Sequence, residues 1–269
     1  MVIIQNLSHT RNIMAKLFTK TILYVVSAFA LTAHAESTPV VNTIDDFTAK
    51  YNIVHGGDIK GKAVRKLKTR DNGDIEFSYR TDIEWMIFSD HRNEETVNQV
   101  VDGVVIPKLY ISSREGTGSD KYYGWSYDYA KKTATNLKKK KPKPQEVEWP
   151  EGLQSKLSFH LQSRFNLINN RKNFNFEVIS TNGKIKNYNF EYIGKEDLML
   201  PYGNIEAIKL KRKKPDSKQV TYVWFAPSLN YLMVKLYLYE SDFKQFHAEL
   251  VSVSDDTIKT EVKTESEVK

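Results

Sequence analysis

Apolar and polar residues alternate along most of the chain, and this pattern predicts a structure made mainly of β-strands. From Phe47 onward, apolar side chains recur at every second position within segments that end at turn sequences. Short pairs containing glycine favour tight hairpin turns between antiparallel strands. The clearest turn sequences are Gly56-Gly57, Asn72-Gly73, Asp102-Gly103 and Asn182-Gly183. The pattern therefore predicts two antiparallel meanders, one in each half of the chain.

A helical period separates the two predicted meanders. Large apolar residues recur there at spacings of four and three, which places them on one stripe of a helix from about Gly152 to Asn169. We expect a mainly β fold, with a large curved antiparallel sheet (a half-barrel) and this principal helix on its concave face. A closed lipocalin-like barrel is the alternative, but it would not leave so prominent a helix in mid-sequence. The stripe consists of Leu153, Leu157, Leu161, Phe165 and Ile168.

The segment from Tyr231 to Tyr239 differs from the other predicted strands, because both of its faces carry apolar side chains. Leucines and a valine alternate with tyrosines and a methionine along it. A strand of this kind is either covered on both sides or lines a cavity.

The first 35 residues have the features of a secretory signal peptide. Lys16 and Lys20 supply positive charge, Ile22 to Leu31 form an apolar core, and Ala33-His34-Ala35 provides a small-residue cleavage site. A transmembrane anchor is the alternative, but the apolar run is shorter than the roughly 20 residues that a span needs. We expect translation to begin at Met14, cleavage after Ala35, a periplasmic location and no membrane span after cleavage.

The rest of the chain is expected to form a single β-rich domain over residues 46–253, which is within the usual size of one domain. Residues 36–45 would form an N-terminal linker. Residues 254–269 lack aromatic side chains, and we expect them to form a disordered tail.

Composition narrows the class of protein further. The chain has no cysteine, so neither a disulfide nor lipid attachment through a thioether is available. The formal net charge is +7, and part of it lies in the predicted signal peptide, so the exported chain would be only mildly basic. Because an exported protein does not meet nucleic acid, we do not expect nucleic-acid binding.

The remaining positive charge is concentrated in two runs. Blocks of like charge repel one another, so both runs are expected in solvated loops or hairpin tips. Such clusters also attract anionic surfaces, of which lipid headgroups and lipopolysaccharide are the natural ones in an envelope. The candidates for this contact are Lys138, Lys139, Lys140 and Lys141 in the first run and Lys211, Arg212, Lys213 and Lys214 in the second.

No sequence motif indicates catalysis, a metal site or a cofactor. The histidines form no His-Glu-x-x-His pair. His91 lies near Glu94 and Glu95, but on a strand these three residues would point to different faces. Ser126 lies in a predicted strand and lacks the closing glycine of a nucleophile elbow. We therefore expect no catalytic residue, no bound metal and no cofactor, and a protein that is not an enzyme.

Aromatic residues make up 12% of the chain. They are first of all good strand formers and core fillers. If the helix leaves part of the concave face open, some of them would instead line an apolar groove able to take an acyl chain. The candidate groove residues are Trp85, Trp125, Phe159 and Trp224.

Several segments resemble a family of exported bacterial proteins known as DUF3108, a domain of unknown function. The similarity lies in the segment from Trp224 to Lys235, in Gly203 to Arg212 before it, in Phe47 to Gly61, and in the turn Asp102 to Tyr110. It spans about Phe47 to Val253. The resemblance implies a periplasmic location and a fold similar to the half-barrel lipoprotein carriers of the outer-membrane localisation pathway.

Two functions from different classes fit these observations. One is a soluble periplasmic protein that binds a lipid or a lipoprotein acyl chain in an apolar groove, with envelope lipid, lipopolysaccharide or lipoprotein as its partner. The alternative is a non-enzymatic envelope scaffold or protein-interaction module.

Overall fold

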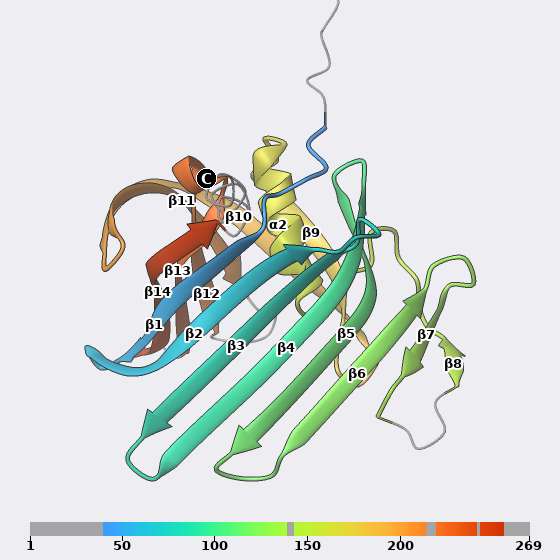
Figure 1. Ribbon diagram of the computed structural model, residues 1–269, viewed down its shortest axis with the longest axis horizontal. Helices are drawn as coiled ribbons and strands as arrows, with labels where there is room; N and C mark the ends of the chain where they lie inside the picture. The colour runs from blue at the N-terminus through green and yellow to red at the C-terminus, as the bar shows by residue number, and fades with distance from the viewer. Residues whose placement is uncertain (1–39, 139–142, 214–218, 241–242, 256–269) are drawn as a thin grey trace, which may run out of the picture. The chain divides into compact units, whose positions relative to one another are not determined.

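The computed structural model describes residues 40–138, 143–213, 219–240 and 243–255. These residues form one antiparallel sheet of fourteen strands and one α-helix, α2 (Figure 1). The first meander comprises β1 (Phe47–His55), β2 (Asp58–Thr69), β3 (Ile75–Trp85), β4 (Phe88–Val101), β5 (Val104–Gly116), β6 (Lys121–Asp128), β7 (Thr133–Asn136) and β8 (Pro144–Glu146). After α2 (Ser158–Ile168), the second comprises β9 (Phe174–Ile179), β10 (Ile185–Leu200), β11 (Gly203–Lys213), β12 (Val220–Ala226), the short 3-10 helix η1 (Pro227–Leu229), β13 (Leu232–Glu240) and β14 (Phe243–Asp255).

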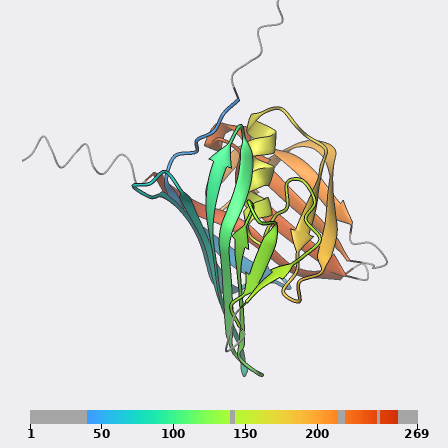
Figure 2. The same ribbon diagram turned by 90° about the vertical axis from the view of Figure 1, so that its right-hand side faces the viewer.

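The two meanders join through their terminal strands. The strand order is β8-β7-β6-β5-β4-β3-β2-β1-β14-β13-β12-β11-β10-β9, so β1 pairs with β14 at the centre of the sheet. Figure 2 shows the sheet bending round α2, with β4 and β5 on one side of the helix and the second meander on the other. The prediction of one curved antiparallel sheet with a helix on its concave face is confirmed.

The predicted helix is longer than the observed one. The chain before Ser158 is not helical, because Gln154 pairs with β9 through hydrogen bonds to Glu177 and Ile179 and residues 156–157 form a turn. The Ser155 hydroxyl accepts the N–H groups of Leu157 and Ser158, at 3.3 and 2.9 Å. The bond from Ser158 satisfies one of the free donors of the first helical turn, which begins there.

The apolar stripe is nevertheless buried from Leu153 to Phe165, and Ile168 at its end is partly buried. Leu153 and Leu157, which precede the helix, are as buried as Leu161 and Phe165 within it. The first strand contributes Tyr51, which is buried beneath the helix and donates a hydrogen bond to the Met233 carbonyl at 2.8 Å. This packing fills most of the concave face.

The structure describes only part of the segments into which the sequence was divided. The described strands run from Phe47 to Asp255. The predicted signal peptide (1–35) lies outside the described residues, as do residues 36–39 of the predicted linker and 256–269 of the predicted tail. These assignments stay predictions.

Candidate functional site

A hollow lies on the face of β10–β13 that points away from α2. Strand alternation fixes this side. Arg212 and Thr221 lie on the helix-facing side, because Arg212 covers Tyr188, a ring that packs against Phe159 of α2. Their neighbours Lys211 and Tyr222 therefore face outward. The hollow has a volume of about 600 Å³ and is lined by Glu196, Leu198, Lys209, Val220, Tyr222, Trp224, Lys235, Tyr237 and Tyr239.

A carboxylate on β10 organises one wall of the hollow. Glu196 accepts hydrogen bonds from the Lys209 ammonium and from the Trp224 indole N–H, each at 2.7 Å. Burial alone would raise the pKa of Glu196, but these two hydrogen bonds outweigh it and hold the pKa below its usual range. The carboxylate is therefore ionised at neutral pH and fixes both partners in place.

A second ammonium group lies across the hollow on β13. Lys235 forms an ion pair with Glu249 at 3.1 Å. Burial lowers the pKa of Lys235, while hydrogen bonds to Tyr237 and Glu249 raise it, and the net shift is upward. Lys235 therefore stays charged throughout the neutral range.

Both lysines also lie over aromatic rings. The Lys209 ammonium is 4.9 Å from the Tyr222 ring centre and 5.0 Å from that of Trp224. Lys235 is 4.7 Å from the Tyr237 ring. Contacts of this kind favour the cation electrostatically and restrict its position. The rings pack edge to face, as in Tyr222 with Tyr239 at 5.8 Å, so the wall is preorganised.

This arrangement suits a ligand with both an apolar and an anionic part. The volume lies within the range of about 300–1,000 Å³ that is typical of small-molecule sites. Aromatic faces take up acyl chains or ring systems, and two ammonium groups attract phosphate or carboxylate.

The four predicted groove residues do not come together. Trp125 and Phe159 are buried in the core between the sheet and α2. Trp224 lines the hollow on the opposite face. The backbone of Trp85 ends β3, and its side chain lies outside the described residues.

The concave face leaves little room for the predicted acyl groove. Beneath α2 the structure has a cavity of only about 20 Å³, beside His160, Leu161 and Arg164, which is close to the space of one water molecule. A separate cleft of about 320 Å³ lies where α2 meets β5 and β9, and both apolar side chains such as Phe174 and Phe176 and polar ones such as Gln162 line it. The predicted groove residues Trp125 and Phe159 are not among the residues that line this cleft.

The basic runs are divided between different surroundings. Lys138 follows β7 and lies 5.3 Å from the Tyr123 ring. Lys211 faces outward beside Tyr222, whereas Arg212 points to the helix-facing side, 4.4 Å from the Tyr188 ring. Lys139, Lys140, Lys141 and Lys214, and the side chain of Lys213, lie outside the described residues.

The sequence pattern missed most residues of the hollow but contained a signal for it. The segment Tyr231–Tyr239 has two apolar faces, and the prediction that it is covered on both sides or lines a cavity is confirmed, since Tyr237 and Tyr239 line the hollow. Glu196 and Lys209 were missed, because single charged residues in a strand pattern do not reveal which neighbours they meet across the sheet.

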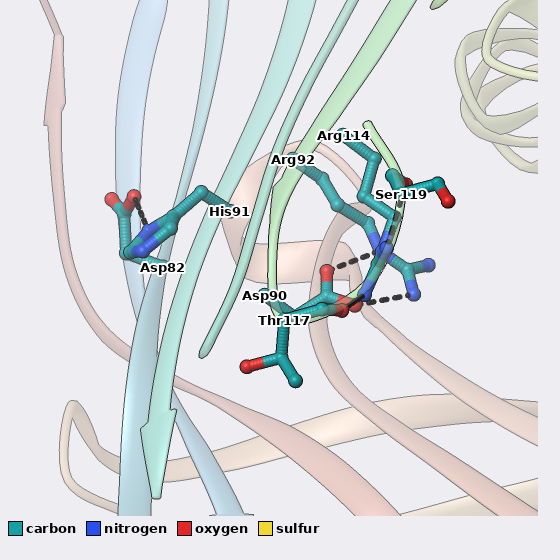
Figure 3. Close-up of polar contacts among 7 residues, drawn as sticks. All are labelled: Asp82, Asp90, His91, Arg92, Arg114, Thr117 and Ser119. Atoms are coloured by element: carbon teal, nitrogen blue, oxygen red, sulfur yellow. Dashed lines mark hydrogen bonds and ion pairs between the residues drawn. The ribbon is translucent and has the colours of Figure 1, made fainter. Parts of the chain in front are cut away.

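His91 has an acidic side chain on the neighbouring strand as its partner. His91 lies 3.1 Å from Asp82 on one side of the sheet, and Figure 3 shows this pair apart from the cluster around Asp90. Glu94 points to the opposite side and accepts a hydrogen bond from Tyr110, as the mixed-face prediction required. Among the residues that the structure describes, no cluster of three or more potential ligands could hold a metal ion.

His160 lies on α2 itself and is half-buried. Its Nδ1 is 3.5 Å from the guanidinium of Arg65. Burial lowers its pKa well below the usual range, and the nearby cations Arg65 and Arg212 lower it further. The ring is therefore neutral at physiological pH, and the charges that act on it are those of cations.

The structure resembles solved proteins of low sequence identity. A β-barrel-like protein of the domain of unknown function DUF1849 from Brucella abortus aligns with a TM-score of 0.53 at 9% identity, covering 80% of this chain and 99% of that one. This likeness concerns the fold alone. The MucA/MucB complex of Pseudomonas aeruginosa gives a TM-score of 0.33 at 10% identity, covering 78% of this chain and 51% of that one.

A protein from Bacteroides fragilis, provisionally described as exported with a YmcC-like fold, gives a TM-score of 0.32 at 10% identity and covers 80% of this chain and 98% of that one. Comparison with curated proteins finds no match. In the ranges that the structure describes, no helix has the length and apolarity needed to cross a membrane. The family model of the protein of unknown function DUF3108 matches residues 46–251, and the chain therefore belongs to the DUF3108 family.

Proposed function

We propose that this protein is a non-catalytic, exported envelope protein that binds an anionic amphiphile in the hollow on β10–β13. The ligand class is a lipid or a lipoprotein acyl chain attached to a phosphate or carboxylate group. The observation that supports this most is the combination of four aromatic side chains with Lys209 and Lys235 around about 600 Å³ of space.

The charges of the hollow support an anionic headgroup. Lys209 and Lys235 each pair with one carboxylate, and each still has donors that the pair does not use, because an ammonium group carries three N–H bonds. An incoming phosphate can therefore bind both ammonium groups without displacing Glu196 from Trp224. A charge-assisted hydrogen bond of this kind is about twice as strong as a neutral one.

The aromatic wall supports an apolar tail. Tyr222, Tyr237 and Tyr239 are all partly exposed along the hollow. Their rings present apolar faces to the space, while their hydroxyl groups remain polar. The location of this ligand class fits the predicted signal peptide, because an exported protein meets envelope lipids directly.

Isothermal titration with monomeric lysophosphatidylglycerol, kept below its micelle concentration, tests the proposal. We expect saturable binding of one molecule per chain. Monoacylglycerol with the same acyl chain, which has no phosphate, should bind about tenfold more weakly, because the charge-assisted contact is lost.

A matched pair of variants localises the binding. Lys209→Gln removes an ammonium group of the hollow that bridges to Glu196 at 2.7 Å. Lys195→Gln breaks an ion pair of nearly the same length, 2.8 Å to Glu206, outside the hollow. Binding should weaken in the first variant and stay unchanged in the second. Equal affinity in both variants, or no binding by the wild-type chain, would refute the proposal.

The alternative of a protein-interaction module through sheet edges has less support. The edge strand β8 has only three residues and begins with Pro144, a residue that blocks strand pairing. At the other edge, Gln154 already pairs with β9 at Val178.

A further inference from the structure

The turn between β3 and β4 carries the most exposed large apolar side chains described. Met86 is 91% exposed and Ile87 is 96% exposed, and the neighbouring Phe88 is also exposed. Figure 1 shows this hairpin at the end of the sheet opposite α2. The two residues are thus placed where they make almost no contact with the rest of the fold.

The backbone of this turn would favour a different residue. Trp85 pairs with Phe88, which leaves Met86 and Ile87 as a two-residue turn, and Met86 has φ of 55°. Such turns favour glycine or asparagine where φ is positive, because a larger side chain is strained there. The sequence therefore retains an exposed apolar side chain at a position where it does not help folding.

The neighbouring turn holds this tip in a fixed shape. The Thr117 hydroxyl donates to the Ile87 carbonyl at 3.2 Å and accepts the Ser89 N–H at 2.9 Å. The Thr117 N–H donates to the Ser89 carbonyl at 2.8 Å. A side chain on Gly116 would come within 2.4 Å of that carbonyl oxygen, so the close approach of the two turns requires glycine.

An ion-pair cluster around Asp90 stabilises the turn that contains Thr117, as Figure 3 shows. Arg114 donates to the Thr117 and Ser119 carbonyls at 2.8 and 3.3 Å and to Asp90 at 2.9 Å. Arg92 donates to the other oxygen of the same carboxylate at 2.6 Å. The tip is therefore a rigid projection. Its exposed side chains are carried by a hydrogen-bonded turn and not by an unstructured loop.

We propose that this end of the sheet inserts into the interface of a lipid bilayer, with Met86, Ile87 and Phe88 as the inserted residues. Two further exposed apolar side chains lie at the same end of the sheet, Ile59 at the start of β2 and Tyr122 at the start of β6. Several projecting turns along one end suit a planar apolar layer. A protein pocket would instead cover a single projection.

The charges next to the tip indicate the kind of membrane surface. They are of both signs: Lys60 pairs with Asp58 at 2.9 Å and Arg80 with Asp82 at 3.1 Å, and the exposed Glu84, Glu115 and Asp120 add negative charge. A rim without excess positive charge gives little attraction to anionic headgroups. Insertion of the tip should therefore depend on the apolar side chains and vary little with salt or with the proportion of anionic lipid. It is also independent of the ligand hollow on β10–β13.

Site-specific labelling tests the proposal directly, because the chain has no cysteine. The full chain is expressed with its predicted signal peptide and purified in the form that the cell produces. Ile87→Cys is labelled with an environment-sensitive dye and mixed with phosphatidylethanolamine–phosphatidylglycerol vesicles and with phosphatidylcholine vesicles. We expect a blue shift with both, and quenching by lipids that carry a bromine atom in the acyl chain. Asp71→Cys, in the exposed β2–β3 turn at the opposite end, should show neither.

Vesicle flotation of unlabelled variants separates insertion from folding. Ile87→Asp should reduce partitioning by about tenfold to a hundredfold, because the apolar contact is replaced by a charge. Met199→Asp, at a methionine that is 86% exposed elsewhere, should leave it unchanged. Met86→Gly should weaken partitioning while the thermal midpoint stays the same or rises, since the turn strain is relieved.

Three results would overturn the proposal. The first is an unchanged dye spectrum at position 87 in the presence of both kinds of vesicle. The second is equal flotation of wild type and Ile87→Asp. The third is a tip that is silent toward vesicles but cross-links to a protein in the intact envelope, which would assign this end of the sheet to a protein partner.

Discussion

The two faces of the sheet are both rich in aromatic residues but use them differently. On the helix-facing side, Phe159 packs against Phe176, Tyr188 and Phe190, and the cavity under the helix measures about 20 Å³. On the outer side of β10–β13, the rings surround a hollow of about 600 Å³. The difference follows from α2, which covers one face and leaves the other to solvent. Aromatic composition alone therefore does not locate a binding site.

The cations of the two faces differ in the same way. Arg65 and Arg164 are buried on the helix-facing side, where Arg164 lies 4.9 Å from the Phe47 ring and donates to the Asn230 carbonyl. On the outer side, Lys209 and Lys235 keep part of their surface exposed. Buried guanidinium groups here hold the fold together, whereas the accessible ammonium groups are available to a ligand.

The largest expected effect concerns the helix that makes the faces different. Phe165 is fully buried on α2, and Phe165→Ala should lower the free energy of unfolding by about 3–5 kcal/mol. Urea unfolding followed by circular dichroism measures this. A loss below about 1 kcal/mol would mean that the helix is not what fills the concave face.

A smaller loss of stability is expected at Asp90. This residue lies on the helix-facing side of β4, beyond the area that α2 covers, where ion pairs take the place of apolar packing. Asp90 is buried and accepts hydrogen bonds from Arg92 and Arg114. Asp90→Asn should lower the free energy of unfolding by about 1–3 kcal/mol, because charged hydrogen bonds are lost and two guanidinium groups lose their partner. Asp128→Asn, at an exposed carboxylate, is the control and should have little effect.

The same carboxylate predicts a dependence of stability on pH. Burial raises the pKa of Asp90, but hydrogen bonds from Arg92 and Arg114 outweigh it, so the folded-state pKa lies below its usual range. Its stabilising contribution is therefore present above the pKa of the unfolded chain and is lost as the pH falls through the lowered folded-state value. Unfolding curves from about pH 7 to about pH 3 should show a smaller acid destabilisation in Asp90→Asn than in wild type. Identical pH profiles would contradict this.

On the outer face, truncation of an aromatic residue should weaken ligand binding more than it lowers stability, which is the reverse of the effect expected at Phe165. Tyr239 is only partly buried and lines the hollow. Tyr239→Ala should cost about 1 kcal/mol or less in stability, yet weaken lysophosphatidylglycerol binding about tenfold. A large loss of stability with unchanged binding would erase the distinction between the two faces.

The smallest expected effect is at the exposed pair that controls for the hollow. Lys195 and Glu206 are each about half exposed at 2.8 Å from one another. Glu206→Gln should change the free energy of unfolding by less than about 0.5 kcal/mol, because exposed ion pairs contribute little. Urea unfolding measures this change. A larger loss would mean that the Lys195–Glu206 pair is not a suitable control for Lys209→Gln.

Local patterns predicted most of the elements and their order, but not the short strands β7 and β8. Alternation and the Gly-containing turns predicted both meanders, and the stripe from Leu153 to Ile168 predicted the helix between them. The helix boundary was wrong by several residues, since the pairing of Gln154 with β9 is a long-range contact that a local period does not contain. The two-faced strand Tyr231–Tyr239 pointed to a cavity without showing where its other walls would be.

The sequence by itself determined the strand-rich class, the two meanders and the helix on the concave face, because side-chain periodicity is a property of neighbouring residues. Only the tertiary structure decided that the helix fills the concave side and that the open site lies on the other. The physical reason is that Trp224, Glu196 and Lys235 lie on different strands, and their meeting depends on the register of β10 to β13. The same holds for the apolar turn at Met86 and Ile87, whose exposure is decided by its position at the free end of the sheet.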